Sequence, residues 1–285
     1  MVNAIEVRGL SKAYKDFMLK NISLSVPVGS VMGLIGENGA GKSTLIRSIL
    51  NMTKCEYEEM MIFGKDVSHH EKEIKEDIAV IFDNTHYNLD FTPAFIGKML
   101  AKVYKKWNMA LYYEYLEKFN LSKKKKLKTF SRGMKMKLEF AIAFSHDAKL
   151  LVLDEATSGL DPVFRDEILE ILRNYTEEED HTILMSSHIT SDLDKIADYI
   201  AYIHNGEMLF VKAYDDVHEN YGIINCNKEL FETLNPEDIV SYRKEAYSYK
   251  VMVKNRLKIQ NSIKDLEIER ASIEDVMLYY AKGEK

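Results

Sequence analysis

Residues 36–44 of the chain read GENGAGKST. They fit G-x-x-x-x-G-K-[ST], a pattern whose glycines let backbone N–H groups converge on a phosphate chain. The short apolar stretch 30–35 precedes the loop, and a predicted helix over 43–50 follows it. We therefore expect a phosphate-binding loop in which Lys42 reaches the terminal phosphates and the Ser43 hydroxyl ligates Mg²⁺. The predicted contacts are Gly36, Asn38, Gly39, Ala40, Gly41, Lys42, Ser43 and Thr44.

A second candidate for chemistry is LLVLDE at 150–155, four apolar residues followed by two acids. A buried strand that ends in carboxylates would place them beside the phosphate loop. We expect Asp154 to hold Mg²⁺ through water and Glu155 to polarise the attacking water as general base. The plainer alternative is an acidic strand end without a catalytic role.

Three further segments follow in a fixed order. FSRGM at 130–134 opens a predicted helix, SGLD at 158–161 comes just after the two acids, and Ser187-His188 ends the next predicted strand. This ordered set resembles the nucleotide-binding subunit of ABC transporters, over about residues 3–212. The resemblance implies ATP and Mg²⁺ as the cofactors, and two such domains that sandwich two ATP molecules.

The resemblance also implies roles for individual residues. Tyr14 corresponds to the aromatic residue that stacks on adenine, and His188 to the switch histidine that senses the γ-phosphate. Ser131 and Gly133 match the signature segment, which contacts the γ-phosphate bound by the opposite protomer, and Asp161 matches the loop that crosses between protomers. Plainer interpretations stay open for three of them: Tyr14 as a half-buried strand residue, Ser131 as a helix N-cap, and His188 as a core histidine.

The signature segment departs from the family's usual LSGGQ. Arg132 replaces a glycine and Met134 replaces an amide, while the serine and the second glycine are kept. We expect a working signature, in which Arg132 adds a cation near the shared nucleotide site.

Another departure lies at Phe82-Asp83-Asn84, where the family normally has a glutamine that touches the metal and the water. Asp83 can still meet Mg²⁺, so it is both a catalytic and a metal-binding candidate. It adds negative charge near the triphosphate, however, and an ionised carboxylate cannot donate the amide hydrogen bond; Asn84 is the alternative donor. Our hypothesis is that Asp83 tunes the Mg²⁺ dependence and slows turnover.

Alternating predicted strands and helices indicate an α/β fold with a mainly parallel sheet, the P-loop NTPase core of an ABC ATPase. We expect an ATPase domain over 1–214, which contains an N-terminal antiparallel β subdomain and an inserted α-helical subdomain at about 86–148. A small α+β appendage over 215–285 would follow; it would either support a dimer or cover sheet edges.

Composition limits where and with what the chain works. The net charge of −6 gives no electrostatic case for nucleic-acid binding. Two distant cysteines, Cys55 and Cys226, fit a reducing cytoplasm. The first residues lack the apolar core of a signal peptide, and the sequence has no apolar run of about 18 residues. We expect a cytoplasmic protein that sits on the inner face of the membrane through a partner.

The leading hypothesis is an ATP-hydrolysing motor that drives a separate membrane permease, as a homodimer or as a heterodimer with a paralogous ATPase. The segment 130–162 resembles ABC-2-type exporters, which often handle antibiotics or amphipathic peptides. A groove for the permease would involve Asp83, the loop 84–95 and aromatics of this region, namely Phe82, Tyr87, Phe91 and Phe95. The alternative is a soluble ABC-type ATPase with a regulatory or resistance role and no permease. A phosphate-loop kinase or GTPase would have no use for FSRGM, Asp161 or His188.

Overall fold

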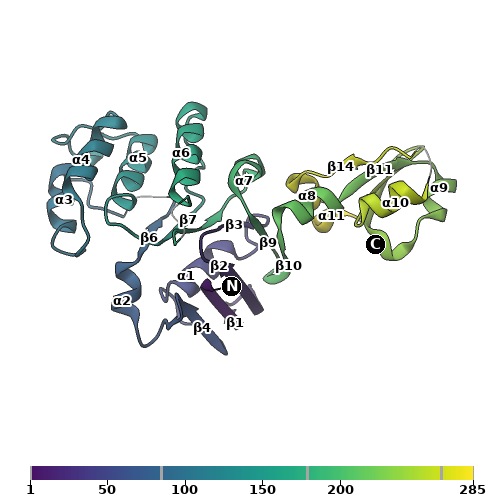
Figure 1. Ribbon diagram of the computed structural model, residues 1–285, viewed down its shortest axis with the longest axis horizontal. Coiled ribbons are helices and arrows are strands. Elements are labelled where there is room, and N and C mark those ends of the chain that lie inside the picture. Colours follow the sequence, from purple (N-terminus) through teal and green to yellow (C-terminus); the bar gives the residue numbers. More distant parts are fainter. Residues whose placement is uncertain (1, 84–85, 178–179, 264–265, 285) are drawn as a thin grey trace.

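The computed structural model describes residues 2–83, 86–177, 180–263 and 266–284. The chain is elongated, with a group of helices at one end, sheets in the middle and a C-terminal α+β unit at the other end (Figure 1).

The centre is a six-stranded sheet with the order β10-β9-β3-β8-β7-β6. All neighbouring pairs are parallel except β9 and β10. Every residue of β3, β7 and β8 is buried, which explains why these strands read as continuous apolar runs. The strands are β3 Val31–Ile35, β6 Ile78–Ile81, β7 Leu150–Asp154, β8 Thr182–Ser186, β9 Tyr199–His204 and β10 Glu207–Ala213.

A second, antiparallel sheet has the order β2-β1-β4-β5. Its buried residues share one hydrophobic core with helix α1 and with one face of the central sheet. Its strands are β1 Asn3–Ala13, β2 Met18–Pro27, β4 Glu59–Ile62 and β5 Lys65–Asp66; α1 spans Lys42–Ile49 and α2 spans Glu71–Glu76. The parallel core and the antiparallel N-terminal sheet confirm the predicted fold class.

Helices cover the other face of the central sheet. They share a large core in which Tyr112 and Phe140 are fully buried. Side chains of Thr92, Asn108 and Ser131 cap the first three of these helices. The elements are α3 Pro93–Leu100, α4 Met109–Lys118, the short 3₁₀ turn Leu127–Thr129, α5 Arg132–Ala143, α6 Pro162–Tyr175 and α7 Thr190–Ile196.

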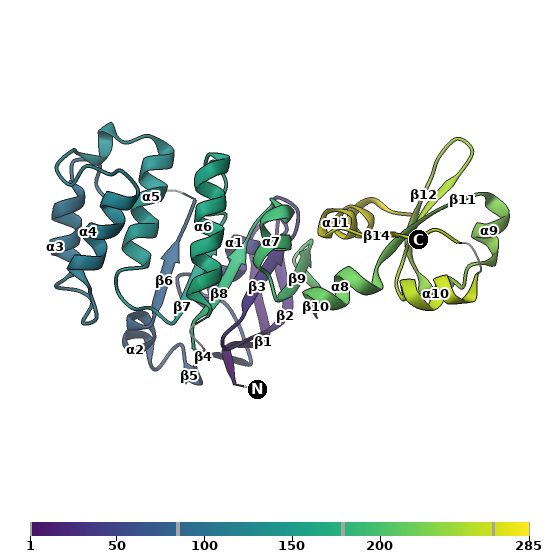
Figure 2. The ribbon, with the colours of Figure 1, turned by 45° about the horizontal axis from the view of Figure 1, so that its top comes forward.

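The C-terminal unit has its own antiparallel sheet, with the order β12-β13-β11-β14. It lies apart from the helices of the opposite end in both views (Figure 2). Its elements are α8 Tyr214–Asn220, β11 Gly222–Cys226, α9 Lys228–Thr233, a 3₁₀ turn Pro236–Asp238, β12 Ile239–Lys244, β13 Tyr249–Val253, α10 Arg256–Ser262, β14 Glu269–Arg270 and α11 Ile273–Lys282. The boundary between the two predicted domains, at 214/215, stays a prediction.

The turn between β9 and β10 joins three parts of the molecule. Asn205 and Gly206 both have positive φ, 48° and 78°, as a two-residue hairpin turn requires. The Gly206 N–H donates to the Ala40 carbonyl in the phosphate loop (3.1 Å), and its carbonyl accepts from Lys20 N–H on β2 (2.8 Å). A Cβ on Gly206 would lie 1.9 Å from the Met18 carbonyl oxygen. The turn therefore fixes the phosphate loop against both sheets.

Gly206→Ala is expected to lower the stability of the fold more than a positive φ alone explains. Gly64 is the matched control, because it has φ +70° and a Cβ added there would meet no atom within 4 Å. Gly64→Ala should cost about 1 kcal/mol, and Gly206→Ala about 2 kcal/mol more because the methyl group meets backbone. Urea unfolding of the two variants measures the difference; equal losses would contradict the proposed packing role.

Candidate active site

The site forms where the carboxyl ends of three parallel strands meet. β3 leads into the loop 36–41, β7 ends at Asp154, and His188 follows β8 two residues after its end. Gly41 is the N-cap of α1 and has φ +114°; a Cβ there would lie 2.8 Å from the Phe17 ring. The loop is thus pressed against the N-terminal sheet, and the N–H groups of α1 face the same edge as the acids.

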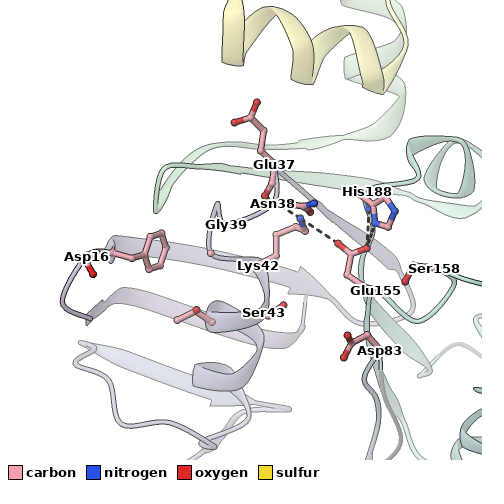
Figure 3. A pocket seen from close by; sticks show the side chains of 13 residues that line it. Asp16, Glu37, Asn38, Gly39, Lys42, Ser43, Asp83, Glu155, Ser158 and His188 are labelled. Atoms are coloured by element: carbon pink, nitrogen blue, oxygen red, sulfur yellow. Dashed lines mark hydrogen bonds and ion pairs between the residues drawn. The ribbon is translucent and has the colours of Figure 1, made fainter. Parts of the chain in front are cut away.

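Lys42 is the buried cation of the site, with a side chain only 6% exposed. Its Nζ donates to the carbonyls of Gly36 (2.8 Å) and Glu37 (3.3 Å) and lies 3.4 Å from Glu155 Oε1 (Figure 3). The ammonium group therefore ties the phosphate loop to the acidic end of β7.

Asp154 is also buried, at 5% exposure, and accepts two hydroxyl hydrogen bonds at Oδ1. Ser43 donates from 3.0 Å and Ser186, at the end of β8, from 2.8 Å. Ser186 Oγ also accepts from the Glu155 N–H (3.1 Å). Sequence reasoning missed Ser186; the paired serines at the end of its predicted strand were the available signal.

The donors present suit Mg²⁺. At phosphate-binding sites Mg²⁺ takes one or two protein oxygens, and phosphate and water oxygens complete its shell. The Ser43 hydroxyl and the Asp154 carboxylate converge beside the phosphate loop and can fill the protein share.

Glu155 and His188 form a carboxylate–imidazole pair at the site. Glu155 Oε2 contacts His188 Nδ1 and accepts the His188 backbone N–H (3.3 Å). An ionised carboxylate only accepts, so in a hydrogen bond to ionised Glu155 the Nδ1 atom of His188 would be the donor. Glu155 has a left-handed backbone with φ +55°, an uncommon conformation for its residue type. Its carboxylate is held between the cation of Lys42 and the imidazole.

These groups border an open cleft of about 640 Å³. It is lined by Asp16, Phe17, Glu37, Asn38, Gly39, Gly41, Lys42, Ser43, Thr44, Asp83, Glu155, Ser158 and His188. Acids outnumber cations along this wall, so a polyphosphate is better accommodated with a divalent ion than alone. Asp83 stands on the side of Glu155 away from Lys42 (Figure 3), while Asn84 lies outside the described residues.

The aromatic residue of the cleft is Phe17, which sequence reasoning did not select. The predicted adenine platform, Tyr14, does not line this cleft; its side chain is 51% exposed and the Lys12 ammonium lies 5.0 Å from its ring centroid. The Tyr14 N–H donates to the Phe17 carbonyl (2.7 Å), so both rings belong to one tight turn between β1 and β2.

Ser131, Arg132, Gly133 and Asp161 do not line the cleft of their own chain, whereas Ser158 of the SGLD segment does. Ser131 accepts from the Met134 N–H (3.1 Å) and Asp161 from the Phe164 N–H (3.0 Å), so both are helix N-caps. Gly133 lies in the first turn of the helix that Ser131 caps.

Arg132 reaches across to the crossing loop. A Cβ placed on Gly159 would lie 3.2 Å from the Arg132 Cζ, so the guanidinium packs closely against Gly159. Arg132 and Asp83 also line one cleft of about 420 Å³, together with Lys135. The two charged positions at which the chain departs from the family pattern thus border the same cleft.

Fold and site together define a P-loop nucleotide-binding protein of the ABC type. The family model for ABC transporters matches residues 19–158. The chain is 32% identical over 238 residues to the lantibiotic transport ATP-binding protein SrtF of Streptococcus pyogenes, covering 80% of this chain and 98% of that one. It therefore belongs to the ATP-binding proteins of ABC transporters.

Two further similarities agree. The bacitracin transport ATP-binding protein BcrA of Bacillus licheniformis is 33% identical over 215 residues, which is 73% of this chain and 69% of that one. A solved structure of the ATP-binding subunit of an ABC transporter superimposes with a TM-score of 0.69 at 27% identity, covering 75% of this chain and 92% of that one.

Across the described residues, no helix combines the length and the apolar character that a membrane crossing requires.

Asp83→Gln is expected to raise the rate of ATP hydrolysis about three- to tenfold, the value of one ordinary hydrogen bond, and to lower the Mg²⁺ concentration needed for half-maximal rate. The amide can donate toward the reacting water and removes a charge. Steady-state phosphate release across a Mg²⁺ titration measures both effects.

Asp16→Asn is the matched control for this prediction, because it removes an acid from the same cleft at another position. An unchanged rate and metal dependence in Asp83→Gln, or equal changes in both variants, would contradict a specific role for Asp83.

Proposed function

We propose that this chain is the ATP-hydrolysing motor of an ABC transporter, which dimerises around two Mg-ATP and drives a separate permease. The observation that carries the proposal is the line of contacts from Lys42 through Glu155 to His188, beside the Ser43–Asp154 pair. It joins a phosphate-binding loop to a poised carboxylate, as hydrolysis by water requires.

The contacts support a role for each of these residues. Lys42 and the loop N–H groups hold the β- and γ-phosphates. Ser43 and Asp154 hold Mg²⁺, which neutralises phosphate charge when bound. Glu155 orients the attacking water and accepts its proton. His188 keeps the Glu155 carboxylate in place through its Nδ1–H and presents the rest of its ring to the cleft.

Dimerisation is supported by the position of the signature residues and Asp161, which stand outside the nucleotide cleft of their own chain. Ser131, Arg132, Gly133 and Asp161 stand outside the cleft of their own chain, on the first turns of α5 and α6 or beside them. A second protomer, of this chain or of a paralogue, would bring its own copies of these residues to the γ-phosphate. Phe17 or Tyr14 would contact the adenine from the β1–β2 turn.

A cleft of about 300 Å³ supports a permease partner. Its lining is mainly apolar and comes from the end of α1, α2, β6 and the residues around them, with Met52, Ile74, Val80, Phe82 and Tyr104 among its members. Phe82 is followed directly by Asp83, which lines the nucleotide cleft. We propose that an amphipathic cytoplasmic helix of the permease docks in this apolar cleft. The Phe82-Asp83 segment would then couple the position of that helix to the nucleotide bound in the neighbouring cleft.

The other three predicted groove aromatics lie elsewhere. Tyr87 lines the cleft that holds Asp83 and Arg132. Phe91 and Phe95 pack against each other, with ring centroids 4.6 Å apart. Only Phe82 of the predicted set belongs to the apolar cleft.

The names of SrtF and BcrA, a lantibiotic and a bacitracin transport protein, support transport of a peptide or drug-like substrate, and export is our proposal for its direction. The protein would then work in the cytoplasm, on the inner face of the membrane, with no nucleic-acid partner. The division into an ATPase domain over 1–214 and an appendage over 215–285 belongs to this proposal.

Glu155→Gln is expected to bind ATP, to hydrolyse it about 100-fold more slowly or worse, and to accumulate as a nucleotide-bound dimer. Lys42→Ala is the contrasting variant, because it should lose nucleotide binding and remain monomeric. Phosphate release and light scattering after gel filtration measure the two properties. A monomer of Glu155→Gln at saturating Mg-ATP would count against the sandwich.

The permease is tested by purification of tagged Glu155→Gln from detergent-solubilised membranes of the source cell, with and without Mg-ATP. An integral membrane protein with several spans should co-purify and be identified by mass spectrometry. Adding Met52→Glu, in the apolar cleft, should abolish its recovery, and adding Val211→Glu, on β10, should not. Recovery of no membrane protein under either condition would favour an ABC-type ATPase without a permease.

A further inference from the structure

The last helix of the C-terminal unit, α11, packs on the ATPase core. Ile273 belongs to the large core cluster, which also contains Leu193 and Ile196 of α7. The hydroxyl of Tyr202, on β9, donates to the Met277 carbonyl (3.1 Å). Burial raises the pKa of Tyr202 to about 12, so this hydroxyl keeps its proton. Figure 2 shows α11 beside α7, away from the body of its own sheet.

The same helix is also held by the C-terminal sheet. Ser241 Oγ on β12 donates to the Tyr279 carbonyl (2.7 Å), and Tyr242 and Glu284 exchange two backbone hydrogen bonds of 2.9 and 2.8 Å. A capping box between Ser272 and Asp275 fixes its start. Helix α11 is therefore anchored on both sides, to the core and to the C-terminal sheet.

A third face of α11 looks toward the nucleotide site. Glu274, Leu278 and Lys282 recur every fourth residue and so form one stripe. They line a cleft of about 450 Å³, whose opposite wall is Glu37, His188 and residues 189–191. Figure 3 shows the Glu37 side chain pointing toward this helix. Glu37 and His188 line the nucleotide cleft as well, so the two clefts share a wall.

We infer that α11 is a positioning element for hydrolysis, acting on the segment that carries His188. The inference rests on the proposed ATPase function. Helix α7 begins at Thr190, two residues after His188, and its inner face packs with Ile273. A shift of α11 therefore moves the start of α7, and with it the imidazole that holds Glu155. The C-terminal unit thereby sets the rate of the chemical step without touching ATP.

Leu278→Asp tests this inference. Leu278 lies on the stripe and outside the apolar clusters that hold α11, so the fold should survive the change. We expect kcat to fall about two- to thirtyfold, the range of mutations that act through a packed network, with the dissociation constant for ATP and the melting temperature unchanged. Lys282→Glu, an exposed change on the same stripe, should lower kcat in the same direction.

Leu257→Asp is the matched control, the same substitution on α10 at a residue 47% exposed; its kcat should equal that of the unaltered chain. A second readout is hydrogen exchange of the amides of residues 273–282 in the Glu155→Gln variant. Their protection should change on addition of Mg-ATP, because a coupling between α11 and the nucleotide site acts in both directions. The inference is overturned, and the proposed ATPase function is not, if the protein is active and both stripe variants have the kcat of Leu257→Asp. The same conclusion holds if hydrogen exchange over α11 is the same with and without Mg-ATP. An unaltered chain without Mg-ATP hydrolysis overturns the proposed function itself.

Discussion

A buried ammonium group organises this site. Removing the charge of Lys42 from water is costly unless it is paired and hydrogen-bonded. The carbonyls of Gly36 and Glu37, just after β3, and the carboxylate of Glu155, just after β7, meet that demand. These positions require the phosphate loop to curl tightly after β3. They also require β7 to end beside that loop. The glycines, the β9–β10 turn that braces Ala40, and the left-handed backbone of Glu155 are all consistent with this geometry.

The sequence was most informative where one segment determines its own structure. The glycine loop between a buried strand and a helix, and the apolar run that ends in two acids, predicted the loop, the acids and the parallel core. His188 could be placed because the end of a parallel strand next to β7 must reach the same edge. These inferences need only local pattern and the geometry of a parallel sheet.

Features that depend on contacts between distant segments escaped prediction. The paired serines at 186–187 mark a strand end, but the bond from Ser186 to Asp154 depends on β8 lying beside β7. Phe17 rather than Tyr14 borders the cleft because of how one turn packs on Gly41. The capping of α5 by Ser131 was foreseen as a plain alternative, whereas the closeness of Asp83 to the cleft of Arg132 was not. Asp83 and Arg132, the two charged departures from the family pattern, line that cleft together.

The wall shared by the two clefts has a consequence for how the protein is made. Glu37 and Glu274 face one cleft although 274 − 37 = 237 positions separate them. Synthesis delivers the phosphate loop first and α11 much later, and contacts of such separation form slowly. A nascent chain therefore holds the loop, the acids and His188 well before α11 can steady the segment beside them. On the inference that α11 positions the His188 segment, full hydrolytic competence would come only with the C-terminal unit, and a partly synthesised chain would hydrolyse ATP slowly.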